Sequence, residues 1–176
     1  GLPEHFTGSI DVKATAYATA TAYATATASG VPVSMVSAAY TQTLAIEGVA
    51  DAPTLLAASG EIAWAPDEGG TLYLTTDGTQ QGESVVGVFS PDTAESSYVQ
   101  FTLSSEDTAG ISVLGATALG GGVYEVDADA LSDVVLTLAD NYKTDFDIAF
   151  TAISKQNETV AESSDTLTFS ASVQHR

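Results

Sequence analysis

The most constraining feature of this sequence is a strict two-residue alternation between positions 14 and 28. Every even position from Ala14 to Ala28 is alanine, and every odd position is threonine or tyrosine. Alanine alone favours helix. Alternation with β-branched and aromatic residues has instead the period of a strand, whose successive side chains point to opposite faces. We therefore predict one long strand, or two strands, with a flat alanine face.

Two interpretations of this tract stay open. It can be a low-complexity strand on the surface of a β-sandwich. It can also be an adhesive strand that pairs with a neighbour, because a flat and regular edge favours pairing and register slippage. The hexapeptide Tyr-Ala-Thr-Ala-Thr-Ala occurs twice, starting at Tyr17 and at Tyr23.

Most of the remaining sequence carries the same two-residue period. Short apolar or alternating runs predict further strands at Tyr40–Glu47, Thr71–Thr75, Ser84–Phe89, Tyr98–Leu103, Ile111–Leu114, Val123–Val126, Val134–Leu138, Phe146–Ile153 and Thr166–Val173. Turn sequences such as Asp77-Gly78 separate them, and Asp127–Leu131 predicts a single helical turn with an acidic N-cap. Many short strands at this spacing predict an all-β fold, an antiparallel β-sandwich or barrel.

The chain is strongly acidic, with 23 Asp and Glu against 4 Lys and Arg and a net charge of −19. Such a surface repels phosphate backbones and anionic lipid heads, so we expect neither nucleic acid nor a membrane as partner. No run approaches the about 18 apolar residues of a membrane span. Oxygen-rich surfaces suit hard cations, chiefly Ca²⁺. The alternative is that the charge serves solubility alone.

Catalytic chemistry has little support in the sequence, and we predict that the protein is not an enzyme. The chain has no cysteine, so disulfides and thiolate metal sites are excluded. Both histidines, His5 and His175, stand near the chain ends. The acidic pairs Asp127/Asp129 and Asp145/Asp147 have a spacing that places both members on one face of a strand, which favours a solvated face or a calcium ligand over a glycosidase pair.

An internal repeat divides the chain. The segment from Leu2 to Ala16 aligns with Leu138–Ala152 at an offset of 136, and Thr43–Ile46 aligns with Thr166–Phe169 at an offset of 123. We therefore predict that residues 1–49 are the closing strands of a preceding or split β-sandwich module. Residues 50–176 are predicted to form a complete β-sandwich module. Gly1 stands in the middle of what reads as an element, so we expect the chain to be an excised fragment.

Several motifs follow one another in a recognisable order: the linker Glu47–Leu55, the acidic pair before Thr71–Leu74, the acidic loop Pro91–Ser96, and Gly122–Val126. The last two predicted strands complete the series. Together they resemble the tandem modules of giant bacterial surface adhesins that are exported by type I secretion, the RTX adhesins. The acidic loop lacks the central Asp-Gly of that family, and Tyr124 stands where the family has Trp.

The resemblance implies an immunoglobulin- or cadherin-like antiparallel sandwich, strung end to end with other modules, outside the cell on the bacterial surface. Its partners would be neighbouring modules of the same chain and a cell-surface sugar or protein ligand. Ca²⁺ would stiffen the linkers. A linker Asp, an acid before the following strand and a loop carboxylate are expected to converge at one end of the sandwich. The expected calcium ligands are Asp51, Asp67, Glu68, Asp92 and Glu95.

Two other functions remain in view. The protein can be a binding module that holds a sugar or peptide, with Trp64, Tyr98 and Tyr124 as the aromatic residues to inspect, although a packing role for Trp64 is favoured. It can also be the subunit of an extracellular filament, in which the Ala14–Ala28 strand or the terminus before it inserts into the next copy by β-strand addition.

Overall fold

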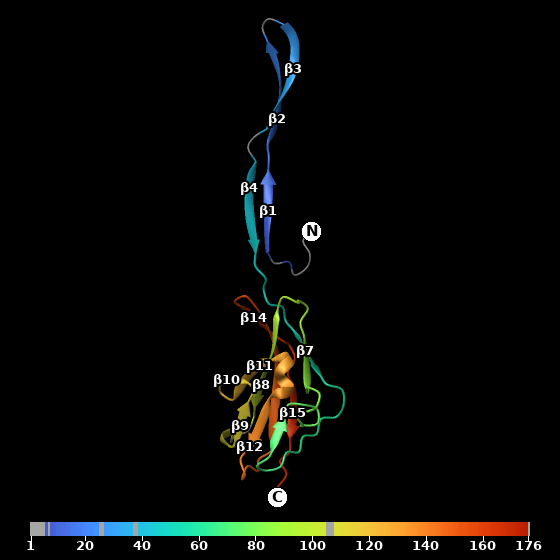
Figure 1. Cartoon of the computed structure of the whole chain (residues 1–176), viewed down its shortest axis with the longest axis vertical. Coiled ribbons are helices and arrows are strands. Elements are labelled where there is room, and N and C mark those ends of the chain that lie inside the picture. The colour runs from blue at the N-terminus through green and yellow to red at the C-terminus, as the bar shows by residue number, and fades with distance from the viewer. Residues whose placement is uncertain (1–5, 7, 25–26, 37–38, 105–107, 176) are drawn as a thin grey trace. The chain divides into compact units, whose positions relative to one another are not determined.

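The fold is nearly all β, as predicted, and consists of antiparallel sheets with two short 3-10 helices among the described residues. It comes from a computed structural model that describes residues 6, 8–24, 27–36, 39–104 and 108–175, with the backbone alone for 17–24 and 27–36. The chain divides into two compact units, Gly1–Gly48 and Val49–Arg176 (Figure 1). No helix within the described ranges has the length and apolar character of a membrane span.

The first unit is built from two successive antiparallel strand pairs. Strand β1 (Gly8–Ala14) pairs with β4 (Tyr40–Ile46), and β2 (Tyr17–Ala24) pairs with β3 (Thr27–Val36). We call the stretch Gly8–Ile46 the first hairpin. Nearly every side chain of β1 and β4 is exposed. β1 and β4 are therefore held together by backbone hydrogen bonds with little buried apolar surface.

The alternating tract forms parts of several strands rather than one. Ala14 ends β1, Tyr17 begins β2, and Ala24 pairs with Thr27 across the hairpin. The long-strand prediction is therefore wrong, and the two-strand alternative holds only in part, because the tract supplies the last residue of β1, all of β2 and the first two residues of β3. The reason is local: Ala24 and Thr27, both within the second Tyr-Ala-Thr-Ala-Thr-Ala unit, lie opposite each other in the β2–β3 pair. The residues from Leu2 to His5, including the first residues of the repeat, lie outside the described ranges.

The second unit, which we call the sandwich unit (Val49–Arg176), contains a six-stranded sheet in the order β10-β11-β8-β13-β14, with β15 also paired to β13. A second sheet has the order β6-β12-β9, and β5 pairs with β7. The strands are β5 Thr54–Ala57, β6 Thr71–Tyr73, β7 Val86–Phe89, β8 Ser96–Leu103, β9 Ile111–Leu114, β10 Thr117–Gly120, β11 Val123–Asp127, β12 Val135–Leu138, β13 Phe146–Gln156, β14 Thr159–Glu162 and β15 Leu167–Ala171. The helices are η1 (Thr108–Gly110) and η2 (Ala128–Asp133).

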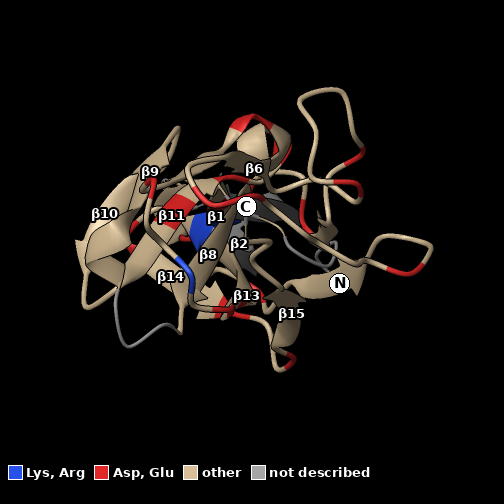
Figure 2. Ribbon diagram, turned by 90° about the horizontal axis from the view of Figure 1, so that it is seen from below, with Lys and Arg blue, Asp and Glu red and all other residues tan. Residues whose placement is uncertain are grey.

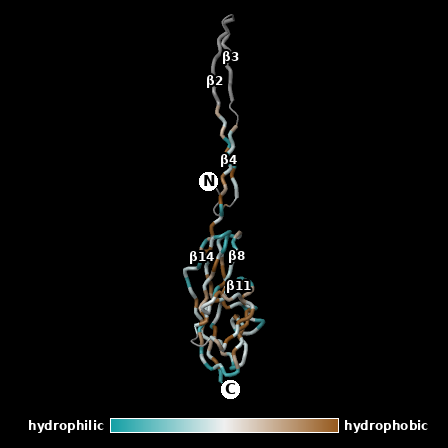
Figure 3. Tube along the Cα trace, turned by 90° about the vertical axis from the view of Figure 1, so that its left-hand side faces the viewer, coloured by the Kyte–Doolittle hydropathy of each residue, from teal (hydrophilic) through white to brown (hydrophobic). Residues whose placement is uncertain are grey.

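One hydrophobic core joins the sheets of the sandwich unit. It combines Phe101 and Phe150 of the larger sheet with Leu72 and Leu136 of the smaller one. Alternation explains this: along β13, residues 146, 148, 150, 152, 154 and 156 are all buried, because every second side chain faces the core. In Figure 3 hydrophobic and hydrophilic residues are interspersed along the trace of the sandwich unit. Burial of this face holds the two layers together.

The predicted turn at Asp77-Gly78 is confirmed, and the predicted helical turn at Asp127 is confirmed only in part. Gly78 follows Asp77 with a φ of 74°, and an added Cβ there would lie 2.8 Å from Leu72 Cδ1. The Asp77 carboxylate accepts hydrogen bonds from the N–H and the hydroxyl of Thr79, which lower the pKa of Asp77. The predicted helical turn is η2, although the Asp127 side chain makes no capping hydrogen bond.

Candidate functional site

The chain enters the sandwich unit at a set of carboxylates in the loop between β7 and β8. The Asp51 N–H donates to Glu95 Oε1, and the Ser90 hydroxyl donates to Glu95 Oε2. Beside them, the Ala50 N–H donates to Thr159 Oγ1 at 2.7 Å. We call this region the entry site. It fixes the incoming backbone to the β7–β8 loop and to the β13–β14 turn.

The buried side chain of Asp92 stabilises the same loop through hydrogen bonds. It is only 9% exposed, and its Oδ1 accepts a hydrogen bond from the Ala94 N–H at 2.8 Å. Its Oδ2 accepts one from Gln156 Nε2 at 3.3 Å. Asp92 therefore connects the loop to the last residue of β13. The other side-chain atom of that amide, Gln156 Oε1, is buried and has no hydrogen-bond partner among the described residues.

The other two predicted ligands, Asp67 and Glu68, lie at the opposite end of the sandwich unit. Asp67 forms a parallel bridge with Gln174, and the Glu68 N–H donates to the Gln174 carbonyl at 3.0 Å. Lys143 Nζ stands 3.7 Å from Glu68 Oε2. Gln174 follows β15, whose last residue Ala171 pairs with the first residue of β13, whereas Asp92 contacts its last.

The expected convergence of all five carboxylates is therefore wrong. The ten peptide steps of β13 separate the two groups by roughly 33 Å at about 3.3 Å per residue. The physical reason is that the segment between Asp51 and Asp67 crosses the unit from one end to the other. The structure brings together Asp51, Asp92 and Glu95, and it places Asp67 and Glu68 elsewhere.

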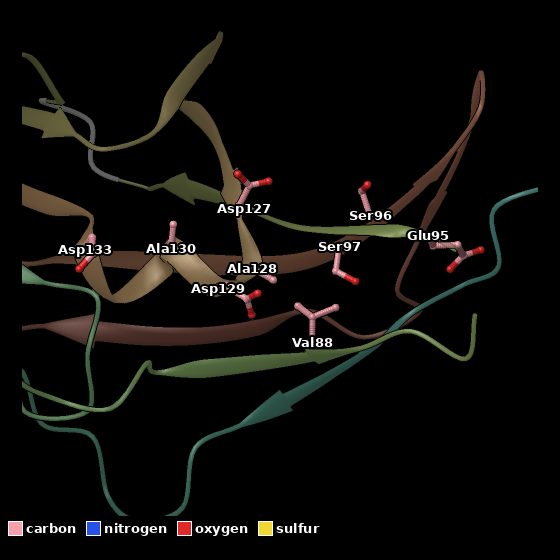
Figure 4. A pocket seen from close by; sticks show the side chains of 9 residues that line it. All are labelled: Val88, Glu95, Ser96, Ser97, Asp127, Ala128, Asp129, Ala130 and Asp133. Carbon is pink, nitrogen blue, oxygen red and sulfur yellow. The ribbon is translucent and has the colours of Figure 1, made fainter. Parts of the chain in front are cut away.

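A polar pocket of about 560 Å³ lies beside Glu95. Its lining residues are Val88, Glu95, Ser96, Ser97, Asp127, Ala128, Asp129, Ala130 and Asp133 (Figure 4). Asp127 ends β11 and Asp129 lies in η2, so this pair is not on one strand face as the spacing predicted. In Figure 4 both lie at the η2 end of the pocket, away from Glu95.

The second acidic pair fixes the last strand. Asp145 Oδ1 accepts a hydrogen bond from the Val173 N–H at 2.7 Å, and Asp147 Oδ1 accepts one from the Ser170 hydroxyl. Both carboxylates therefore accept hydrogen bonds from residues in β15 or directly after it. Within the described part of the chain, no three His, Cys, Asp or Glu side chains form a group that could hold a metal ion. A cation at the entry site would need amide or backbone oxygens as further ligands.

The three aromatic residues proposed for sugar binding are already engaged. Trp64 is 3% exposed and donates from Nε1 to the Thr75 carbonyl at 2.7 Å. Tyr124 stacks on Phe101 with ring centroids 5.3 Å apart. Lys155 Nζ lies 4.3 Å from the centre of the Tyr98 ring. The packing role favoured for Trp64 is what the structure has.

The chain matches no known protein family, no curated protein and no solved structure.

Proposed function

We propose that the chain is a calcium-stabilised structural module of a bacterial cell-surface adhesin, with an immunoglobulin- or cadherin-like sandwich, and that it has no catalytic role. The observation that carries this proposal is the entry site, where Glu95 accepts a hydrogen bond from the incoming backbone at Asp51 and Asp92 connects the same loop to Gln156 at the end of β13. A joint between consecutive modules needs stiffness at this point. An extracellular location agrees with the acidic surface and with a hard cation as stabiliser.

Calcium fits the entry site better than the far end. Gln156 Oε1 is a buried oxygen with no hydrogen-bond partner among the described residues, next to the Asp92 carboxylate, and such an atom needs an unseen water or ion. Glu68 instead lies near the positive charge of Lys143. We therefore assign Asp92, Glu95 and Gln156 as the residues that would hold Ca²⁺, which would link the loop to the end of β13.

Thermal melts test this assignment. Binding at ten times the dissociation constant adds roughly 1.4 kcal/mol, which raises the melting temperature by several degrees in millimolar Ca²⁺ relative to EDTA. The variant Glu95→Gln should lose this shift, because a carboxylate ligand is gone. The matched control Asp67→Asn, at the other end of β13, should keep it. Identical melts of the wild-type protein with Ca²⁺ and with EDTA would contradict the calcium proposal.

Antibody labelling tests the proposed location on the cell surface. An antibody raised against the sandwich unit should label intact cells of the source organism without permeabilisation. Labelling that needs permeabilised cells would refute a surface adhesin, whatever the melts show.

The filament subunit is the second candidate, because the first hairpin has exposed strands. Removal of residues 1–49 should then abolish assembly in size-exclusion chromatography, and an unchanged monomer would refute it. The sandwich unit gives strand donation less support, because its core already contains its own β13 and β15. The sugar or peptide module is third, since Trp64 is buried.

A further inference from the structure

Each unit contains an antiparallel strand pair of corresponding register: β1 with β4 in the first unit, and β13 with β15 in the sandwich unit. In the first hairpin Asp11 pairs with Thr43, and the Thr43 hydroxyl donates to Asp11 Oδ1 at 2.6 Å. In the sandwich unit Asp147 pairs with Ser170, and the Ser170 hydroxyl donates to Asp147 Oδ1. Asp11 and Asp147 are the residues that the offset of 136 aligns. A cross-strand hydrogen bond of the same kind therefore occurs at the same register in both.

This register corrects the alignment of the second strand. Thr43 lies opposite Asp11, and Ser170 lies opposite Asp147, which is the counterpart of Asp11. Thr43 therefore corresponds to Ser170 at an offset of 127 (170 − 43). The sequence alignment placed Thr43 on Thr166, four residues earlier. The correspondence that follows is Ile10/Leu44 with Phe146/Ala171, Val12/Gln42 with Ile148/Phe169, and Ala14/Tyr40 with Phe150/Leu167.

Corresponding faces differ in burial. Phe146, Ile148 and Phe150 are at most 3% exposed in the core of the sandwich unit. In the first hairpin Val12 is 48% exposed and Leu44 is 47% exposed. Directly opposite residues share a face, so β1 and β4 together present Ile10, Val12, Leu44 and Ile46 on one side, with Gln42 as a polar exception. We call this side the open face.

The edge of β1 is open as well. In the sandwich unit, β13 pairs with β15 on one edge and with β8 on the other, where Leu103 lies opposite Ile148 and Phe101 opposite Phe150. Among the described residues β1 pairs only with β4 (Figure 1). The two charged residues of 8–46, Asp11 and Lys13, both belong to β1 and lie on the side opposite the open face, because successive side chains of a strand point to opposite faces. The open face itself therefore carries no charged residue.

We propose that the first hairpin closes a second sandwich. Its open face would pack on the opening strands of another module of this same fold, and the free edge of β1 would pair antiparallel with that module's counterpart of β8. In this register the counterpart of Leu103 lies opposite Val12, and that of Phe101 lies opposite Ala14. The inference rests on the modular role proposed above and is independent of calcium. A sandwich unit of a second copy does not offer this position, because β13 already occupies it.

The test supplies the missing strands to the full chain. A duplicate of residues 49–137 is placed directly before Leu2, so that Leu2 takes the position of Leu138. Hydrogen exchange is then followed by mass spectrometry in β1 and β4. We expect exchange there to become slower than in the unextended chain by on the order of 100-fold, as for strands that enter a core. Exchange in the original sandwich unit reports whether the molecule is intact.

Paired substitutions locate the effect. Val12→Asp on the open face should remove the new protection, whereas Lys13→Asp on the opposite face should keep it. Unchanged exchange in β1 and β4, with an intact downstream sandwich unit, overturns the proposal. So does concentration-dependent protection of β1 in the unextended chain that Val12→Asp removes, because a second copy would then cover the open face. A missing calcium shift with slowed exchange would reject the calcium assignment and leave the hairpin inference standing.

Discussion

At the scale of single residues, Lys155 and Glu125 form the most enclosed ion pair among the described side chains. Lys155 Nζ contacts Glu125 Oε1, and Gln100 Nε2 donates to Glu125 Oε2 at 2.9 Å. Burial opposes ionisation of Glu125, but the hydrogen bonds from Gln100 and Lys155 and the charge of Lys155 outweigh it, so the pKa of Glu125 is lowered. Lys155 Nζ also lies over the Tyr98 ring.

The variant Lys155→Met should reduce the free energy of unfolding at pH 7 by about 1–3 kcal/mol, because a hydrogen bond to a charged group is lost. Glu125 has a lower pKa in the folded state, so its contribution is complete above its unfolded pKa of about 4.3 and disappears as pH falls through the folded value. The deficit should therefore shrink in acid. Urea unfolding at several pH values measures it.

Lys143→Met is the matched control. Lys143 has 61% of its side chain exposed and stands 3.7 Å from Glu68, so its loss should cost at most about 1 kcal/mol. Equal losses for the two lysine variants at pH 7 would show that the enclosure of Lys155 contributes nothing.

At the scale of elements, one hairpin occurs in two environments within one chain. The register of β1 and β4 corresponds to that of β13 and β15, yet the first hairpin lacks a covering sheet among the described residues. A two-stranded hairpin alone is at best marginally stable in water. The same side chain position should therefore matter greatly in one hairpin and little in the other.

Ile148→Ala and Val12→Ala test this difference at corresponding positions. Ile148 is fully buried, so its truncation should cost about 2–5 kcal/mol. Val12→Ala should change the stability of the sandwich unit by less than about 0.5 kcal/mol. Denaturant unfolding followed by the fluorescence of Trp64, the single tryptophan, measures both. A large loss for Val12→Ala would mean that the open face already packs on something.

Individual strands could be predicted from the sequence better than the places where distant segments come together. Strands with strict alternation, such as β8 and β13, follow from the sequence because one face is buried along their whole length. The short strands β5, β10 and β14 were missed, because Leu55 is the one buried side chain in these three strands and they therefore carry no alternation of buried and exposed residues. The separation of Asp51 from Asp67 was also missed. It depends on the path of the irregular segment between them, which has no local signature.

At the scale of the whole molecule, charge is unevenly distributed between the two units. Residues 49–176 hold 20 acidic and 3 basic residues, a net charge of −17 (3 − 20), whereas residues 8–46 are neutral. Figure 2 shows acidic residues on several separate loops and strands, with few basic ones. Self-repulsion of this kind destabilises a compact state. Repulsion among its carboxylates therefore lowers the free energy of unfolding of the sandwich unit.

Salt should consequently stabilise the protein without calcium. Raising NaCl from about 0.01 M to about 0.15 M shortens the screening length from about 30 Å to about 8 Å, so the melting temperature in EDTA should rise. The calcium shift should persist at constant ionic strength, and Mg²⁺ serves as the divalent control. A melting temperature that does not respond to NaCl would contradict the role assigned to repulsion.

The placement of the entry site has a mechanical consequence. The chain enters the sandwich unit beside the last residue of β13 and leaves, after β15, beside its first. A pull on the two ends of the unit would therefore run along β5 and β15, in line with their strands. Their hydrogen bonds to β7 and β13 would be loaded side by side, in shear, and would have to break together. A unit connected in this way resists tension far better than one that can be unzipped a bond at a time.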